Sequence, residues 1–474
     1  MQRPFAILLT LLLCAGSAPA DDAWLQSGGP AAQAELGARL RQLEAETQTL
    51  RDEVRWLRER TARAPQAESP QDEAVLNRLN APPADALKAA GDKEHYALEA
   101  ATSEGKKLAW TKGELSLVPY GILWFNMNYE TQRTNDGDFT YYVFSPSDPR
   151  GGEPDFNVNV RATRLGFDLV GPRIPFFHDA NSGGKLEIDF FGASVNTENR
   201  AGVLLRHAYV ELKNEQFRLL AGQTYDIISP LWPGTLLYTI GWSAGNIGYR
   251  RAQLRGERYI ALSDTALITA TGGLVADLVS EFAAPVVVGD HGTWPTLQGR
   301  LGATLGPRGE GCTPVDVGIS AHLGQQRFVI SGFRADAEPL TWSLNADFHY
   351  PITSRFGVQG EFFTGENLGT YMGGILQGIN VTTGEPIRST GGWMEVWYDW
   401  TPRTHTHVGC GIDDPLNRDI TNGRTCNEFI FANISYDLTA KFLVGFEYTD
   451  WNTLYDVQAD AHSDRFEFVA KYGF

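Results

Sequence analysis

Charged and apolar residues alternate in several segments of the chain. The charged residues of these segments are the ones whose types and spacing could bind a solute or an ion. Successive side chains of a β-strand point to opposite faces, so the apolar set takes one face and the charged set the other. The polar set is Arg164 in segment 160–170, Glu187 and Asp189 in 185–191, His207 and Tyr209 in 206–212, and Arg251 and Arg255 in 249–258. A guanidinium is always charged and can clamp a carboxylate with two parallel hydrogen bonds. If several such arginines line the inside of one channel, a row that we call the arginine ladder, they would favour small anions, carboxylates above all.

Three further arginines, Arg161, Arg206 and Arg250, do not fit the alternation of their segments. A β-bulge, or a position at the level of a loop, is needed to turn them toward the same face as the others. A strand read one residue out of register would invert every one of these face assignments. An alternative to a selective ladder also stays open. Arginines and carboxylates on one wall can compensate one another and set only the shape of the lumen.

A long connection follows one of the early charged strands, over residues 225–248. It is rich in Pro, Gly and apolar residues, so it would make a poor loop if water surrounded it. We expect it to fold inward as a constriction, and we assign Tyr225, Asp226 and Trp232 to that constriction. Packing against a neighbouring subunit is the alternative.

The elements that position these residues are strands of period two. In 340–350 the residues Leu340, Trp342 and Leu344 begin an apolar face, while Thr341 and Ser343 begin a polar one. The chain ends on 466–474, where alternate residues are again apolar and the last is aromatic. Such strands suit lipid outside and water inside, and an open sheet edge cannot survive in hydrocarbon, so they predict a closed transmembrane barrel. A soluble β-sandwich shows the same alternation and stays the alternative fold.

The region 113–474 predicts an all-β barrel of about sixteen antiparallel strands, each long enough to cross a membrane when tilted. Short connections such as 214–216 and 401–404 alternate with long ones such as 131–156 and 366–390. An even number of strands puts both ends of the barrel on the periplasmic side. A barrel of this size keeps a water-filled lumen.

The first 112 residues precede the barrel in three parts. Residues 1–20 have the layout of a secretory signal peptide, and no later segment is apolar enough for a spanning helix. In 33–62 the residues Leu36, Leu43, Leu50 and Leu57 recur every seven positions, which predicts a periplasmic α-helical coiled coil that associates with copies of itself. The Pro- and Ala-rich segment 63–112 reads as a linker. A formal net charge of −17 makes nucleic acid an unsuitable partner.

The spacing of the cysteines predicts a structural disulfide and no catalytic thiol. Cys410 and Cys426 flank a polar, turn-rich segment, and an exported protein permits disulfides, so we expect this pair to bridge and Cys312 to stay reduced. No C-x-x-C motif supports thiol chemistry. His405 and His407 share a strand face, but two ligands without a third are weak evidence for a metal site. We therefore predict no metal, no cofactor and no enzymatic activity.

Four short segments of the barrel region resemble the strand motifs of DcaP-like outer-membrane porins. They are Arg161–Phe167, Leu205–Glu211, Leu220–Thr224 and Arg251–Arg255, and the segment Gly411–Pro415 and the terminal Phe474 fit as well. The coiled coil is also similar to that family. The resemblance implies a homotrimer of sixteen-stranded channels that passes small anionic solutes, such as dicarboxylic acids, through arginine-lined constrictions. The strongly acidic balance and the expected disulfide loop depart from the family pattern.

These observations together predict a porin in the outer membrane of a diderm bacterium, in contact with outer-membrane lipid and small solutes. Two other functions stay open. The barrel could be an enzyme, although no Ser or Asp stands in a recognisable nucleophile setting. It could also be an adhesin or an anchor that touches the cell wall through its coiled coil, which predicts a plugged or narrow lumen.

Overall fold

The computed structural model describes residues 109–134, 140–197, 200–278, 287–291, 294–308, 312–330 and 336–474. The predicted signal peptide, the coiled coil and nearly all of the linker lie outside these residues. The chain divides into two units between residues 81 and 82, and all described residues belong to the second. Within the described residues, no helix is both long enough and apolar enough to cross a membrane.

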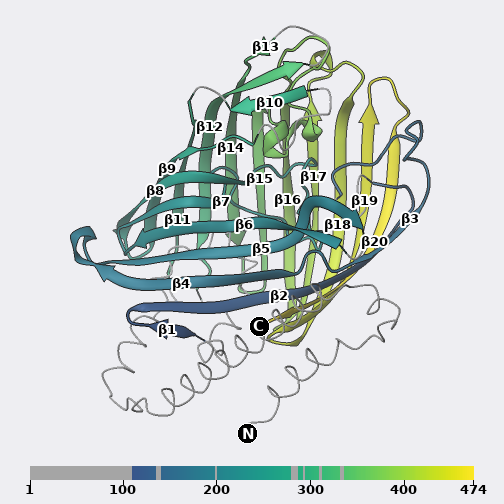
Figure 1. Cartoon of the computed structure of the whole chain (residues 1–474). Coiled ribbons are helices and arrows are strands. Elements are labelled where there is room, and N and C mark those ends of the chain that lie inside the picture. Colours follow the sequence, from purple (N-terminus) through teal and green to yellow (C-terminus); the bar gives the residue numbers. More distant parts are fainter. Residues whose placement is uncertain are drawn as a thin grey trace, which may run out of the picture. The chain divides into compact units, whose positions relative to one another are not determined.

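Sixteen antiparallel strands form the wall of a closed barrel in the described part of the chain (Figure 1). The strands of the wall are β2 (Leu115–Glu130), β4 (Arg164–Ile174), β5 (Ala180–Thr197), β6 (Arg200–Lys213), β7 (Phe217–Tyr225), β8 (Arg250–Ser263), β9 (Ala266–Val275), β11 (Thr296–Leu305), β12 (Val315–Ile330), β14 (Leu340–Pro351), β15 (Phe356–Glu366), β16 (Arg388–Thr401), β17 (Thr404–Pro415), β18 (Arg424–Thr439), β19 (Phe442–Tyr455) and β20 (Ala461–Gly473). The first and last of these pair from Ile122 opposite Gly473 to Glu130 opposite Arg465, which closes the barrel.

Four shorter strands extend this wall. The strand β3 (Asp155–Asn159) continues the line of β4, because both pair with β2 and only residues 160–163 interrupt them. A small hairpin partner, β1 (Trp110–Lys112), lies against the start of β2. The strands β10 (Val287–His291) and β13 (Asp336–Ala337) both pair with the end of β12 and stand above the wall in Figure 1. The predicted number of wall strands is therefore confirmed.

The barrel carries its apolar side chains on the outside. On β14 Leu344 is 57% exposed, while its neighbour Asn345 is 6% exposed. On β19 Phe446 is 49% exposed, whereas Glu447 is fully buried. A soluble sandwich needs the reverse, with the apolar face in a core, so the sandwich alternative is wrong. This surface matches the lipid-facing band of a transmembrane barrel.

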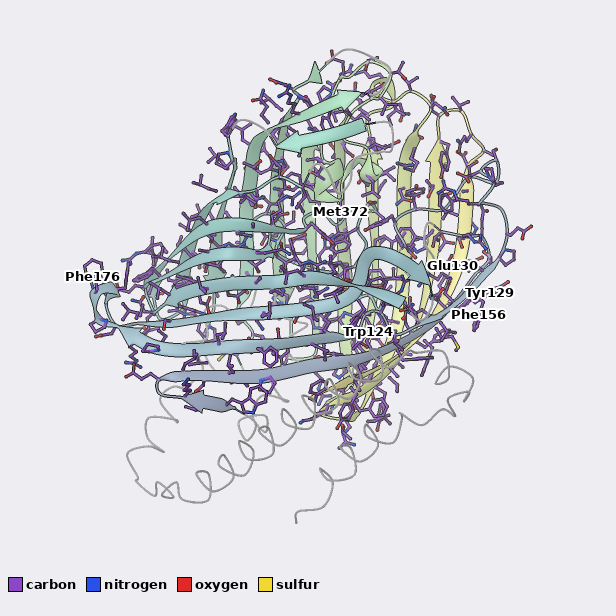
Figure 2. All side chains as sticks on the ribbon, in the orientation of Figure 1. Trp124, Tyr129, Glu130, Phe156, Phe176 and Met372 are labelled. Atoms are coloured by element: carbon purple, nitrogen blue, oxygen red, sulfur yellow. The ribbon has the colours of Figure 1, made fainter. Side chains whose placement is uncertain are left out.

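A row of aromatic side chains crosses four neighbouring strands on the outer face. Tyr129 of β2 pairs in register with Phe156 of β3 on one side and with Phe466 of β20 on the other. Phe466 in turn pairs with Tyr448 of β19. Figure 2 shows Tyr129 and Phe156 side by side near one edge of the wall. Amphipathic rings concentrate at the boundary between hydrocarbon and water, so this row marks one membrane interface.

The connections follow the plan of short turns at one end and long loops at the other. Residues 214–216 join β6 to β7, and the Asn214 side chain accepts the backbone N–H groups of Gln216 and Phe217 at 2.8 and 3.0 Å. The long connections include 131–154, 226–249 and 367–387, the last with two 3-10 turns, η3 (Gly369–Tyr371) and η4 (Gly374–Leu376). Two further 3-10 turns are η2 (Pro175–Phe177) and η5 (Asn417–Asp419).

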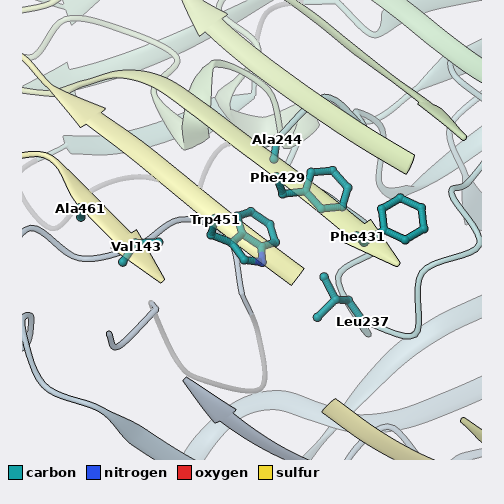
Figure 3. Close-up of a cluster of buried hydrophobic side chains, with 7 residues drawn as sticks. All are labelled: Val143, Leu237, Ala244, Phe429, Phe431, Trp451 and Ala461. Atoms are coloured by element: carbon teal, nitrogen blue, oxygen red, sulfur yellow. The ribbon is translucent and has the colours of Figure 1, made fainter. Parts of the chain in front are cut away.

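The long loops pack inside the barrel around apolar clusters. One cluster joins the loop residues Val143, Leu237 and Ala244 to Phe429 and Trp451 on the inner wall (Figure 3). The rings of Phe429 and Trp451 stack with centroids 5.0 Å apart. A second cluster joins loops 226–249 and 367–387, and it contains Ile228, Ile247, Phe363, Leu368 and Tyr371. Part of the lumen is thus a dry aromatic and aliphatic interior, which buries apolar loop surface that would be exposed to water.

The expected disulfide does not form. Cys410 lies opposite Ile430 on the neighbouring strand, and Cys426 lies four residues before Ile430 on that strand. At about 3.4 Å per residue this offset separates the two Cα atoms by roughly 13 Å or more, well beyond the ~7 Å that a disulfide can span. All three cysteines of the described region are unbridged. The two cysteines do not mark the base of a loop, because Cys410 lies within β17 and Cys426 lies within β18.

Candidate solute channel and its basic wall

The inner faces of strands β4 to β8 carry most of the basic side chains that the sequence analysis predicted to face inward. We call these inner faces the basic wall. Alternation places Arg164, Glu187 and Asp189 on the inner face, all of them buried, together with the half-buried His207 and Tyr209. On β8 the outward residues Ala252 and Leu254 are exposed, and the inward Arg251 and Gln253 are buried. The predicted parity of these strands agrees with the structure.

Arg206 reaches the lumen through a β-bulge. Glu187 pairs with His207 and the next residue, Ile188, pairs with Leu205, so Arg206 is the extra residue of the β5–β6 ladder. Both Arg206 and His207 can therefore face inward. A bulge lets two residues of one strand oppose a single residue of its partner and re-aims a side chain in this way.

Two carboxylates compensate the Arg206 guanidinium. Its Nε donates to Glu187 at 2.6 Å, and its Nη1 donates to Asp189 at 2.9 Å. Its Nη2 donates to the Tyr225 hydroxyl at 2.9 Å. Tyr238 of the inward loop donates its own hydroxyl to Asp189 at 2.5 Å. Burial raises the pKa of Tyr238 well above its usual value, so this hydroxyl keeps its proton.

Arg250 and Arg251 follow each other at the start of β8, and both are buried. Arg251 forms an ion pair with Asp226 and donates to the Thr370 carbonyl at 2.5 Å, and it lies over the Tyr371 ring at 3.7 Å. It therefore ties loop 226–249 to loop 367–387.

The partly exposed cations of the inner face are a different set. Lys185, Arg218, Arg255 and Arg300 each keep 11 to 17% of the side chain exposed. Each also has a carboxylate partner, namely Asp168, Glu211, Glu257 and Asp347 in the same order, at 2.8, 2.6, 3.6 and 2.5 Å. Sequence reasoning identified only Arg255 of these four, although Lys185 shares the parity of Glu187 and Asp189.

The other predicted residues take supporting positions. Arg161 lies in the break between β3 and β4 with its guanidinium over the Phe191 ring at 5.0 Å. The Nδ1 atom of His207 lies 3.0 Å from the Thr224 hydroxyl. Tyr209 lies beneath the Arg218 guanidinium at 5.6 Å. Trp232 packs its ring against Tyr225 with centroids 4.5 Å apart.

Loop 226–249 lies inside the barrel and runs along the inner wall. The backbone N–H of Leu231 donates to Glu361 of β15 at 2.7 Å, that of Gly234 to Glu395 of β16 at 2.6 Å, and that of Leu236 to Glu447 of β19 at 2.8 Å. At its start the N–H of Ile227 donates to Gln298 of β11 at 2.8 Å. The loop thus follows the wall from β11 to β19.

Three of the wall carboxylates serve the loop and not a cation. We call Glu361, Glu395 and Glu447 the acidic anchors, because they hold the loop by its backbone. They are at most 6% exposed, so the loop stands between them and the lumen. Alternation along 441–448 predicts an inward Glu447, but no local signal in the sequence shows that these three carboxylates hold a loop.

The structure brings one group of metal-type ligands together in the described part of the chain. Ligand atoms of Asp450, His462 and Asp464 lie within 4.8 Å of one another on the outer face, a group that the sequence analysis did not foresee. His462 contacts Asp450 at 2.9 Å and Tyr448 donates to Asp464 at 2.6 Å, so hydrogen bonds already satisfy the group. By contrast, His405 lies between Asp399 and Asp437, and His407 contacts Glu395, so this pair shares no common ligand position.

Comparison with solved structures identifies the fold. The outer-membrane channel DcaP of Acinetobacter baumannii matches with a TM-score of 0.61 over 77% of this chain and 99% of that chain, at 14% sequence identity. The chain has the fold of the DcaP outer-membrane channel. An anion-selective porin from Comamonas acidovorans matches with a TM-score of 0.49 at 12% identity, over 76% of this chain and 100% of that one. OmpF of Salmonella typhi, in complex with daunomycin, matches with a TM-score of 0.48 at 13% identity, over 77% and 100%.

No protein-family model matches the sequence, and no curated sequence matches it either. The DcaP-like fold and the apolar exterior agree, because a closed barrel with lipid-facing side chains outside and charged ones inside is built to span an outer membrane. The barrel is therefore an outer-membrane barrel.

Proposed function

We propose that this protein is a porin that lets small hydrophilic solutes diffuse passively across the outer membrane and favours small anions such as carboxylates. The observation that carries the proposal is the path of loop 226–249. It lies inside the barrel and is fixed to the acidic anchors through its backbone N–H groups. The loop narrows the lumen, and the partly exposed basic side chains of β5, β7, β8 and β11 stay in reach of a solute.

Anion preference follows from which charges a solute can meet. The acidic anchors are buried behind the loop, whereas Lys185, Arg218, Arg255 and Arg300 keep part of their surface exposed. Two of their carboxylate partners, Asp168 and Glu211, are exposed as well, at 34 and 22%. Arg218 and Arg255 carry charges that attract a carboxylate, although two donors of each guanidinium already bond to protein acceptors. Their existing carboxylate partners weaken the field, so the preference is a bias and not an exclusion of cations.

The buried arginines have a different role in this proposal. Arg206 and Arg251 are engaged with carboxylates and loop atoms, so they shape the constriction and do not bind solute themselves. The two readings that the sequence left open thus apply to different residues. The buried arginines are a scaffold, and the partly exposed cations are the selective group.

The assembly belongs to the same proposal. The heptad pattern in 33–62 supports self-association through a periplasmic coiled coil, with the linker 63–112 between coil and barrel. The number of copies, three, rests on the resemblance to DcaP-like porins and not on the heptads. The coil would then extend toward the cell wall and could contact it.

Solute flux into liposomes tests the proposal. Protein that is shown to be folded should accelerate swelling of liposomes in small carboxylates more than in cations of equal size. An anchor or an adhesin predicts no swelling in any solute, and that result would overturn the proposed function.

A further inference from the structure

Arg250 is a buried arginine of the basic wall, and no carboxylate among the described residues forms an ion pair with it. Its side chain is buried at 2% exposure. Its Nη2 donates to the Tyr249 hydroxyl at 3.1 Å, but its Nη1 has no hydrogen-bond partner. Burying a guanidinium without a counter-charge is strongly unfavourable, so the site lacks one negative charge.

The rings around Arg250 do not supply that charge. The guanidinium carbon lies 4.7 Å from the Tyr249 ring centroid and 5.5 Å from that of Tyr225. Cation–π contacts stabilise the cation, yet they leave its charge in place. Two aromatic rings thus lie within 6 Å of the guanidinium, while its Nη1 donor stays vacant.

The neighbouring charges make the deficit larger. Arg206 lies close enough for the two guanidinium groups to repel each other, and Tyr225 contacts both, through its hydroxyl with Arg206 and through its ring with Arg250. The buried carboxylates nearby, Glu187 and Asp189, are already taken up by Arg206. Arg164 acts on Glu187 as well. Glu187 and Asp189 are therefore engaged by other guanidinium groups, and neither forms an ion pair with Arg250.

We propose that a single monovalent anion binds on the free edge of Arg250, beside Tyr225 and Tyr249, and holds the end of loop 226–249 against the basic wall. One negative charge balances the group, whereas a divalent anion would leave an excess. The chemistry admits a halide or a small carboxylate such as acetate. This is a resident site at the root of the loop, and it does not depend on whether solutes pass through the lumen.

Thermal unfolding of the detergent-folded, full-length protein tests the site. Chloride or acetate replaces gluconate, which is too large for a buried site, at constant ionic strength. Because a ligand that binds only the folded state stabilises it, the wild-type protein should show a saturable rise in Tm, and R250Q should lose that rise. Saturation with chloride alone identifies a halide site, and saturation with acetate alone identifies a carboxylate site.

The matched control is R300Q, which removes an inner-wall arginine that already has Asp347 as its partner. It should unfold at a lower temperature but keep the anion dependence. An anion-independent Tm in the wild-type protein, or equal dependence in wild type and R250Q, would overturn the proposal. If R250Q does not fold, titration calorimetry of the wild-type protein decides, with about one anion bound per chain expected and no saturable binding as the contrary result. If no anion binds at Arg250, the protein can still conduct ions. If the protein does not conduct, the anion can still bind at Arg250, so the two proposals are tested separately.

Discussion

The backbone N–H of Leu231 donates to the side chain of Glu361 at 2.7 Å, although the two residues are 130 positions apart in the chain. A loop inside a wide barrel must satisfy its backbone donors, because it has no sheet partner there. Inward-facing carboxylates do this for loop 226–249 at three places. The position of the loop is therefore set by side chains of the opposite wall.

Removing the acidic anchors should release the loop. In the triple variant E361A/E395A/E447A, three backbone donors lose their acceptors, and each such loss costs about 1–3 kcal/mol. We expect a larger and noisier single-channel conductance than in the wild-type protein. The matched control is E361Q/E395Q/E447Q, which keeps an acceptor oxygen at each place and should conduct nearly as the wild type. Equal conductance in all three proteins would contradict the role of the anchors.

Arg206 should contribute more to stability than any exposed arginine. In R206M the carboxylates Glu187 and Asp189 lose the cation that compensates them, and breaking a buried pair of this kind costs about 3–5 kcal/mol. We expect a clearly lower Tm in thermal unfolding. The variant R206M/E187Q/D189N removes all three charges and should recover most of the loss. A Tm for R206M within a degree of the wild type would argue against the buried ion-pair group.

The partly exposed cations should set ion preference. One unit charge about 10 Å away in water changes the energy of an ion by about 0.4 kcal/mol, roughly twofold in local concentration. Replacing Lys185, Arg218, Arg255 and Arg300 by Gln should therefore lower the anion-to-cation permeability ratio by at least about twofold. The reversal potential under a salt gradient measures this. R403Q, at the exposed turn between β16 and β17, is the control and should leave the ratio unchanged.

The Arg388–Asp419 pair should hold segment 416–423 in place at neutral pH but not at acidic pH. Arg388 donates to both carboxylate oxygens of Asp419 at 2.7 Å, and these hydrogen bonds hold the pKa of Asp419 below its usual value. A carboxyl whose pKa is lowered by folding stabilises the fold above its unfolded pKa of about 3.9 and loses that contribution as pH falls through the folded value.

Accordingly, D419N should make segment 416–423 more sensitive to limited proteolysis at neutral pH. The difference from the wild-type protein should disappear at a pH below the folded pKa of Asp419, where a pepsin-type protease can be used. D148N is the control, because it breaks a similar pair with Arg150 in another loop. Cleavage in 416–423 that is equal in D419N and wild type at neutral pH would contradict the proposed tie.

The cysteines give a direct chemical check of the strand register. Because Cys410 and Cys426 are four residues out of register on neighbouring strands, both should react with a maleimide in denatured, unreduced protein. The mass should rise by the same increment before and after treatment with a reductant. Labelling of this pair that requires reduction would show that the register is wrong.

Sequence reasoning reached the barrel, its sixteen strands and the inward faces of β4 to β8, because alternation is a local signal that each strand carries in its own residues. It failed where the answer depends on pairing between strands. The outward pattern of 206–212 does not show that Arg206 is the extra residue opposite Glu187 and Ile188. The spacing of Cys410 and Cys426 suggested a loop, because no local signal gives the register of β17 and β18.

The sequence alone also does not show which arginines are buried and which are partly exposed. Arg251 and Arg255 share one face of one strand, yet the first is buried against Asp226 and the second remains partly exposed. The difference arises from contacts with the end of β7 and the loop after it, because Asp226 pairs with Arg251 whereas Arg255 donates to the Tyr225 carbonyl at 2.6 Å. Contacts between residues far apart in the chain, such as Leu231 with Glu361, decide which side chains line the channel.

The most direct test of the central claim is the current through single molecules of the folded protein in a planar bilayer under a salt gradient. The account predicts stepwise conductance with a reversal potential shifted toward that of the anion. Folded protein that gives no conductance, or a reversal potential shifted toward that of the cation, would contradict it.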